Sequence, residues 1–166
     1  MNRTQLLSLA RRVGRRVSDF GLGSGISALA RSETQRESQP EARRDISIEV
    51  GVREALGWLE RARDYSLSED SGVARHYSLV SGWSASYPET TGYIVPTLIA
   101  EGRARGNEVL LARARKMLDW LVSIQMPCGA FQGSTVDTSN VVPVTFNTGQ
   151  ILLGLAAGVA EFGGEY

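Results

Sequence analysis

Thr91-Gly92-Tyr93-Ile94 recurs as Thr148-Gly149-Gln150-Ile151, and this repeated block decides the fold. The match keeps a constant offset of 57 residues and extends to further pairs: Leu98/Leu155, Ala100/Ala157, Gly106/Gly163 and Glu108/Glu165. A second match, with an offset of 62, lies upstream of each block and pairs Arg53, Leu56, Trp58 and Leu59 with Arg115, Leu118, Trp120 and Leu121. A period near 60 residues with two helical segments in each unit is typical of an array of helical hairpins.

The second copy stops early. It ends at Glu165-Tyr166, where the first copy is entering its next helix at Glu108-Val109. We therefore expect this chain to be the front part of a longer protein whose C-terminal hairpins are missing, so that one inner helix presents an exposed apolar patch.

The composition excludes several classes of partner. Eighteen basic and eighteen acidic residues cancel, so no global charge favours nucleic acid. The single Cys128 excludes an internal disulfide and fits a reducing, cytoplasmic location. No segment approaches the roughly 18 apolar residues of a transmembrane helix, and the N-terminus lacks the apolar core of a signal peptide.

Residues 1–47 differ from the rest as a basic extension, disordered or partly helical, and residues 1–45 carry a net charge of +4. Arginines cluster on a short helical pattern that Gly21–Gly25 ends, and 31–45 is polar like a linker. One interpretation is attachment to an acidic membrane surface or to a partner. The other is a solvated extension, which the composition favours.

Residues 48–166 predict an all-α domain. Apolar residues at helical spacing predict one helix from about 48 and three more over about 91–105, 107–126 and 147–162. Pro96 is expected in the first turn of the second helix, where proline is tolerated. Gly106-Asn107 makes the second and third helices antiparallel neighbours. In the nearly uncharged fourth helix, which we expect to be buried on most sides, Gly154 and Gly158 predict close approach to a neighbouring helix.

The order of the helices predicts where a site would form. Long loops, about 66–90 and 127–146, lead from a charged outer helix to an apolar inner helix, whereas the return connection is tight. In a closed ring of such hairpins all long loops gather on one rim, above the N-termini of the inner helices. Unpaired backbone N–H groups and the positive ends of the helices point toward that rim.

Two segments resemble known families. Gln125–Phe131, which follows a Trp-Leu helix, resembles the Gln-x3-Gly-x-aromatic element of terpenoid cyclases and protein prenyltransferases. These families share an (α/α)6 toroid with six-hairpin glycosidases and sugar epimerases. Gly82–Tyr93, together with Val144–Gln150, is similar to uncharacterised bacterial toroid proteins associated with polysaccharide biosynthesis.

The resemblance implies that residues 48–166 form about two of the six hairpins of an α/α toroid. Departures from the pattern matter equally. The chain contains no Asp-x-Asp-Asp run of the kind that protonates polyprenyl substrates, and Cys128 and His76 are each the only residue of their type, so the zinc ligands of prenyltransferases have no counterpart. We expect no metal site and no cofactor.

Three residues are candidates for acid–base catalysis. Glu89 lies at the entry of an inner helix among aromatic residues, where a carboxylate can have a raised pKa. The alternative is that Glu89 only stabilises the first helical turn. His76 could carry protons from the first long loop, although a lone loop histidine is usually just exposed. Asp137, in the second loop, is the acid that could face Glu89 across the rim.

Five residues are candidates for substrate binding: Trp83, Tyr87, Tyr93, Asn147 and Gln150. Asn147 and Thr148 are taken as the equivalents of Glu89 in the second copy, so the repeat itself does not require the acid. The aromatic residues suit a saccharide platform or simply the core; Phe131 suits the core, and Trp58 and Trp120 are interpreted as structural. Asp70 is a weaker polar candidate.

Three hypotheses for function follow. The leading one is a carbohydrate-active enzyme or accessory protein of bacterial polysaccharide metabolism, with acid–base chemistry or sugar binding at the long-loop rim. The second is a non-catalytic helical-repeat scaffold that binds protein or glycan. The third is an isoprenoid cyclase or prenyltransferase. Clustering of the candidate side chains in one concavity would favour the first, and a deep apolar pocket the third.

Overall fold

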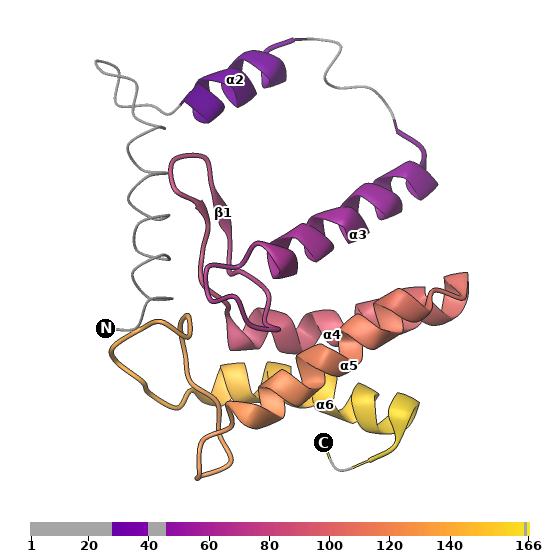
Figure 1. Ribbon diagram of the computed structural model, residues 1–166, viewed down its shortest axis with the longest axis vertical. Helices are drawn as coiled ribbons and strands as arrows, with labels where there is room; N and C mark the ends of the chain where they lie inside the picture. The colour runs from indigo at the N-terminus through magenta and orange to yellow at the C-terminus, as the bar shows by residue number, and fades with distance from the viewer. Residues whose placement is uncertain (1–27, 40–45, 165) are drawn as a thin grey trace. The chain divides into compact units, whose positions relative to one another are not determined.

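A computed structural model describes residues 28–39, 46–164 and 166. The predicted basic helix near the N-terminus, residues 40–45 of the predicted linker and the final repeat pair at Glu165 lie outside the described residues. Figure 1 shows the described helices and strands: α2 (Ala28–Glu37), α3 (Ile48–Asp64), β1 (Tyr77–Ser78), β2 (Gly82–Trp83), α4 (Pro88–Arg105), α5 (Glu108–Ser123) and α6 (Thr145–Phe162). The prediction of an all-α fold is confirmed for this part of the chain.

The described residues divide into two compact units. The first holds the described residues up to Leu56 together with Tyr77–Gly82, and the second holds Gly57–His76 and Trp83–Tyr166. Within the first unit, Arg36 pairs with Glu33 one turn earlier on α2, and residues 31–37, interpreted from composition as linker, belong to this helix. The repeated block lies wholly in the second unit.

The hairpin of α4 and α5 forms as predicted because Gly106 ends α4 and Asn107 caps the start of α5. Gly106 has φ 59°, a left-handed conformation that favours glycine, and it follows the last residue of α4. Asn107 then caps α5: its side-chain oxygen accepts hydrogen bonds from the N–H groups of Val109 (3.0 Å) and Leu110 (3.3 Å). The two helices therefore pack as antiparallel neighbours.

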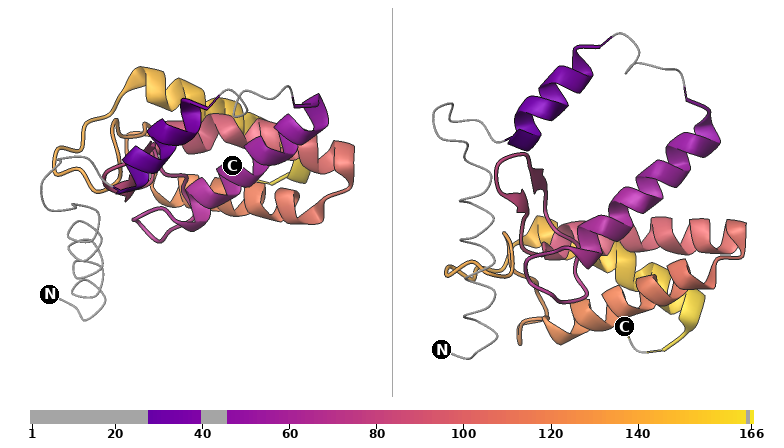
Figure 2. Two further views of the ribbon diagram at one scale, coloured as in Figure 1. Left: turned by 90° about the horizontal axis from the view of Figure 1, so that it is seen from above. Right: turned by 45° about the horizontal axis from the view of Figure 1, so that its top comes forward.

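α4 and α6 run in the same direction and pack closely, while α5 returns beside both (Figures 1 and 2). The beginnings of the two helices are joined through Tyr87 and Asn147, and their ends through the ion pair of Arg103 and Glu161. Close approach is made by glycine: a Cβ added to Gly92 would lie 2.5 Å from the Ile151 Cα. The repeated glycine thus sets the distance between the predicted inner helices.

Glycines on α6 make the predicted close contacts with its neighbours. A Cβ on Gly154 would lie 2.3 Å from the Gly92 carbonyl oxygen, and one on Gly158 would lie 2.5 Å from a methyl carbon of Leu118. α5 contributes a continuous apolar stripe to this core, in which Leu110, Ala114, Met117, Leu118 and Leu121 are all buried. The predicted stripe is confirmed, although α5 ends at Ser123, before the predicted boundary near 126.

Pro96 is not in the first turn of α4, as predicted, but inside the helix. The error arose because α4 begins three residues earlier than expected, at Pro88, which takes the favourable first position instead. Since proline has no N–H, Pro96 cannot donate to the carbonyl of Gly92 one turn before it. That carbonyl is the group that Gly154 of α6 approaches, so the proline and the helix contact occupy the same turn.

The prediction that α6 is buried on most sides is wrong. Ile151 and Leu155 are buried, but Leu152, Leu153 and Val159 are 52%, 57% and 43% exposed. Its neighbours α4 and α5 cover only one side of α6. The exposed side of α6 is therefore an apolar patch.

Candidate functional site

The same hydrogen-bonded arrangement of a threonine, which we call the lock, occurs at the start of both α4 and α6. In the first copy, the Thr91 hydroxyl accepts a hydrogen bond from the Val73 N–H (2.9 Å) and donates one to the Tyr87 carbonyl (2.9 Å). The Tyr87 N–H in turn donates to the Val73 carbonyl (2.9 Å). One threonine therefore holds the preceding long loop against the residue that begins α4.

The second copy repeats this geometry. The Thr148 hydroxyl accepts from the Phe131 N–H (3.0 Å) and donates to the Val144 carbonyl (2.9 Å), while the Val144 N–H donates to the Phe131 carbonyl (3.1 Å). Phe131 is fully buried, as predicted. The repeated threonine thus locks loop to helix in both copies, whereas the glycine after it packs against another helix in the first copy, where Gly92 meets Ile151.

A polar cluster forms where α4 and α6 begin. The Asn147 side-chain amide donates to the Tyr87 phenol oxygen at 3.0 Å, and the phenol is hydrogen bonded to Glu89. The Arg75 guanidinium lies 5.2 Å from the centre of the Tyr87 ring. Tyr87, Glu89 and Asn147 were all predicted site residues, so the structure brings three of them together.

Burial raises the pKa of the Tyr87 phenol above its usual value of 10.0, and the hydrogen bond to Glu89 raises this pKa further. Both effects favour the neutral phenol, which can donate to the Glu89 carboxylate while its oxygen accepts from Asn147. Glu89 also lies in the first turn of α4, where a carboxylate stabilises the helix. The cluster therefore links a carboxylate, a phenol and an amide at two helix N-termini.

The predicted equivalence of Glu89 with Asn147 and Thr148 is wrong, by one position for Asn147 and by two for Thr148. α4 begins at Pro88 and α6 at Thr145, so the offset of 57 places Phe146 opposite Glu89. Asn147, which is 5% exposed, instead points its amide at Tyr87 of the first copy. The acid has no polar counterpart in the second copy.

Asp137 and His76 do not join the hydrogen-bonded cluster. The exposed Asp137 carboxylate accepts from the Thr135 hydroxyl (2.7 Å) within its own loop. That loop does cross the first one, because the Val136 N–H donates to the Ser86 carbonyl (3.0 Å). His76 is exposed, and its backbone N–H donates to the Ser84 hydroxyl (3.1 Å) at the neck of the β1–β2 hairpin.

The three remaining binding candidates lie in different surroundings. Trp83 is buried, and its ring centre is 4.8 Å from that of Trp58, so it contributes to packing. Tyr93 is 43% exposed and lies one helical turn after Glu89, on the same side of α4. Gln150 is half-buried on α6 at the position equivalent to Tyr93.

Sequence reasoning missed a buried network of serines that fixes the first long loop. The hydroxyls of Ser66 and Ser86 are 2.6 Å apart, and the Ser86 hydroxyl donates to the Asp70 carboxylate (2.6 Å). The Gly72 N–H also donates to Asp70 (2.8 Å), and the Ser68 hydroxyl accepts from the Ser86 N–H (2.9 Å). The spacing Asp70-x-Gly72 is a turn signal, but nothing in the sequence pairs these residues with Ser86, sixteen positions after Asp70.

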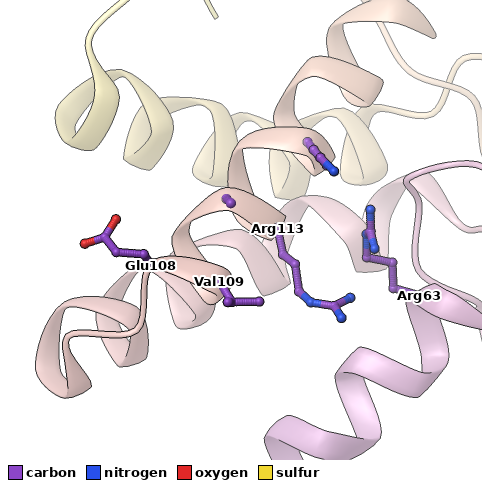
Figure 3. A pocket seen from close by; sticks show the side chains of 6 residues that line it. Arg63, Glu108, Val109 and Arg113 are labelled. Carbon is purple, nitrogen blue, oxygen red and sulfur yellow. The ribbon is translucent and has the colours of Figure 1, made fainter.

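A basic hollow of about 380 Å³ lies between the end of α3 and the first half of α5, where Arg113 reaches toward Arg63 (Figure 3). The Arg113 guanidinium binds Asp64 with two hydrogen bonds, of 2.7 and 3.1 Å. This pairing lowers the pKa of the Asp64 carboxyl, with smaller contributions from the charges of Arg113 and Arg63. The arginines therefore connect α3 to α5 and are already occupied by a carboxylate.

Comparison with known proteins does not extend this description: no protein-family model, curated protein or solved structure matches the chain. Within residues 28–39, 46–164 and 166, no three His, Cys, Asp or Glu side chains are grouped so that they could hold a metal ion. None of the helices described there is both long and apolar enough to span a membrane. The polar cluster around Tyr87 is therefore the candidate site on the evidence of its geometry.

Proposed function

We propose that residues 48–166 form about two hairpins of an α/α toroid whose long-loop rim binds a saccharide. The observation that carries this proposal is the hydrogen bond between Tyr87 and Asn147, 3.0 Å, because it joins side chains from the beginnings of two successive inner helices. Each unit of such an array adds one helix N-terminus to the rim. Neighbouring units thus supply adjacent polar groups to one binding surface.

The side chains at this rim suit a polyhydroxylated ligand. A carboxylate, a phenol and an amide offer acceptors and donors for vicinal hydroxyl groups. The exposed ring of Tyr93, one turn after Glu89, offers an apolar face to the C–H groups of a sugar ring. Under this proposal Glu89 would transfer protons, because it is the carboxylate beside the Tyr87 phenol.

The proposal is tested by ligand-observed NMR with a panel of oligosaccharides prepared from bacterial capsular and exopolysaccharides. We expect at least one oligosaccharide to bind, and Tyr87→Phe and Glu89→Gln to weaken its binding roughly tenfold, the effect of losing one hydrogen bond. Asp119→Asn, an exposed carboxylate on α5, is the matched control. Absence of binding across the panel, or equal binding by all variants, would refute the proposal.

A non-catalytic helical-repeat scaffold is a second candidate, and the exposed apolar side of α6 favours it. Phe146 is 64% exposed on this side and Leu153 is 57% exposed. A surface of this kind marks a place where another chain segment or protein packs. Under this second function, Tyr87→Phe and Glu89→Gln would leave partner binding unchanged.

A further inference from the structure

Equivalent positions of α4 and α6 differ systematically in burial. Residues 57 positions apart occupy the same place after the same lock. Five positions are buried in α4 and exposed in α6: Pro88/Thr145, Gly92/Gly149, Val95/Leu152, Ile99/Ala156 and Gly102/Val159. These five positions fall on one side of the helix, at spacings of three and four residues. One side of α4 is therefore covered, and the same side of α6 is bare.

The next helical hairpin along the chain covers this side of α4. Gly92 packs on Ile151 of α6, and a Cβ added to Gly102 would lie 2.8 Å from a methyl carbon of Leu111 of α5. The covering unit thus consists of an outer helix, α5, and an inner helix, α6. Each of them meets α4 at a position that a glycine keeps open.

Among the described residues, the corresponding glycine of α6 meets no neighbour. A Cβ added to Gly149 would find no atom within 4 Å, although its equivalent Gly92 is the closest contact between α4 and α6. The exposed residues around Gly149 carry no charge, and the charged residue of α6 is Glu161 near its end. We call this surface the α6 face and define it by six exposed residues: Phe146, Gly149, Leu152, Leu153, Ala156 and Val159.

An open hollow adjoins the α6 face where an outer helix would lie. It measures about 440 Å³ and lies between the end of α5 and α6, with Val122, Leu152, Val159 and the last residue, Tyr166, in its lining. In the first copy, the corresponding space between the end of α3 and α4 holds α5, whose Arg113 binds Asp64 and whose Leu111 packs on Gly102. The hollow and the α6 face therefore correspond, 57 residues later in the repeat, to the surface of α3 and α4 on which the α5–α6 hairpin packs.

We propose that the α6 face is the docking surface for a further helical hairpin of the same repeat. Its outer helix would fill the hollow beside Val159. Its inner helix would cross at Gly149 and carry glycine or alanine there, as α6 carries Gly154. This inference stands on the repeat geometry and is independent of the saccharide site.

A second copy of this chain fits the surface less well. Its α6 already presents Ile151 and Gly154 to its own α4. On its α4, the position equivalent to Gly154 is Thr97, whose side chain would prevent the close approach that glycine allows. The repeat relationship therefore favours a separate hairpin over self-association.

The test adds such a hairpin to the full chain. A second copy of residues 107–163 is fused after Gly163, and the accessibility of the α6 face is read from the rate at which a thiol reagent modifies Leu152→Cys in a Cys128→Ser background. We expect the fusion to slow this reaction roughly tenfold relative to the unfused chain. Ala112→Cys, exposed on α5, should react equally fast in both proteins.

Gly149→Leu in the first copy of the fusion should restore rapid modification, because the added side chain occupies the crossing point. Val159→Cys provides a second reporter if Leu152→Cys alters the helix. Unchanged reactivity in the fusion, or an added hairpin that stays unfolded by circular dichroism, would overturn the proposal. Two results with the unfused chain would also overturn the proposal. If a concentration-dependent dimer protected Leu152→Cys from the reagent, the occupant of the α6 face would be a second copy. If phosphatidylglycerol vesicles protected it, the occupant would be a membrane.

Discussion

α4 and α6 follow the same lock with the same Thr-Gly step, yet one helix is enclosed and the other is half bare. In α4 the repeated glycine, Gly92, lies against the backbone of Ile151, whereas in α6 Gly149 faces open space. The local sequence is therefore sufficient to begin a helix and hold its loop, but burial depends on the unit that follows. In an array of repeats, a side of each unit is buried only where a neighbouring unit packs against it.

The two copies also differ at the positions that begin each helix. Tyr87 and Glu89 in the first copy correspond to Val144 and Phe146 in the second. The lock uses only the backbone of Tyr87 and Val144, so the side chains at this position are free to differ. Chemistry and structure are thus separated within one short segment: the threonine builds the lock, and the residues before it supply the polar groups.

The largest expected difference between the copies is the change in stability when their repeated glycines are replaced. Gly92→Ala should destabilise the protein by about 3 kcal/mol, because the new Cβ would lie 2.5 Å from a backbone atom that cannot move alone. Gly149→Ala should instead stabilise it by about 0.5–1 kcal/mol, since alanine favours the helix and meets no atom. Urea denaturation of both variants measures the contrast, and equal changes would show that the two glycines are equivalent after all.

Replacing the threonines of the two locks should have the next largest effect on stability. Thr91→Val leaves the N–H of Val73, which is 1% exposed, without its acceptor and should cost about 1–2 kcal/mol in the free energy of unfolding. Thr148→Val should cost less, since Thr148 is only half-buried. Thr97→Val, exposed on α4, should change stability by less than about 0.5 kcal/mol. A neutral Thr91→Val would mean that the lock does not hold the loop.

Much of this architecture could be predicted from the sequence because it is local. Period, capping and glycine spacing place α4, α5 and α6, and the positive φ of Gly106 follows from its position between two helices. The start of α4 was missed because Pro88 and Pro96 are both acceptable first-turn residues, and only tertiary packing shows which one is used. A helix boundary that is determined by packing against another helix leaves no signal in the neighbouring sequence.

The candidate site could be predicted only in part, for a similar reason. Tyr87, Glu89 and Asn147 could be predicted because they lie at the starts of α4 and α6, and helix starts leave a local signal in the sequence. For Trp83 the sequence left a binding role and a core position open, because aromatic residues suit both, and its neighbour Trp58 lies on another element. The buried bond between Ser66 and Ser86 spans twenty residues of irregular chain, and no period connects such positions.

The ionisation of Tyr87 gives a smaller difference between the copies. Its counterpart in the second copy is Val144, whose side chain cannot ionise. Of the five tyrosines, Tyr87 should ionise above pH 10.0 in an absorbance titration, since burial and Glu89 both favour its neutral form. Stability from this group is fully present below its unfolded pKa of 10.0 and is lost as the pH rises through the folded pKa. Glu89→Gln should lower the pKa of Tyr87, and Tyr93→Phe should not. A pKa of Tyr87 that rises in Glu89→Gln would contradict the assigned hydrogen bond.

The smallest expected effect concerns the ion pair between Asp64 of α3 and Arg113 of α5. Asp64 accepts two hydrogen bonds from Arg113, and its pKa is lowered from the usual 3.8 mainly by this contact. A carboxylate with a lowered folded pKa stabilises the protein fully above its unfolded pKa and loses that contribution as the pH falls through the folded value. Because the pair is partly exposed, Asp64→Asn should cost less than about 1 kcal/mol at neutral pH.

That cost should shrink as the pH falls below 3.8, where protonation of Asp64 weakens the pair in the unsubstituted protein as well. Urea denaturation of Asp64→Asn and the unsubstituted protein across this range measures the change. Asp119→Asn, an exposed acid on α5, serves as the control for general charge effects. A cost that stays constant down to strongly acidic pH would mean that Asp64 helps through packing instead of charge.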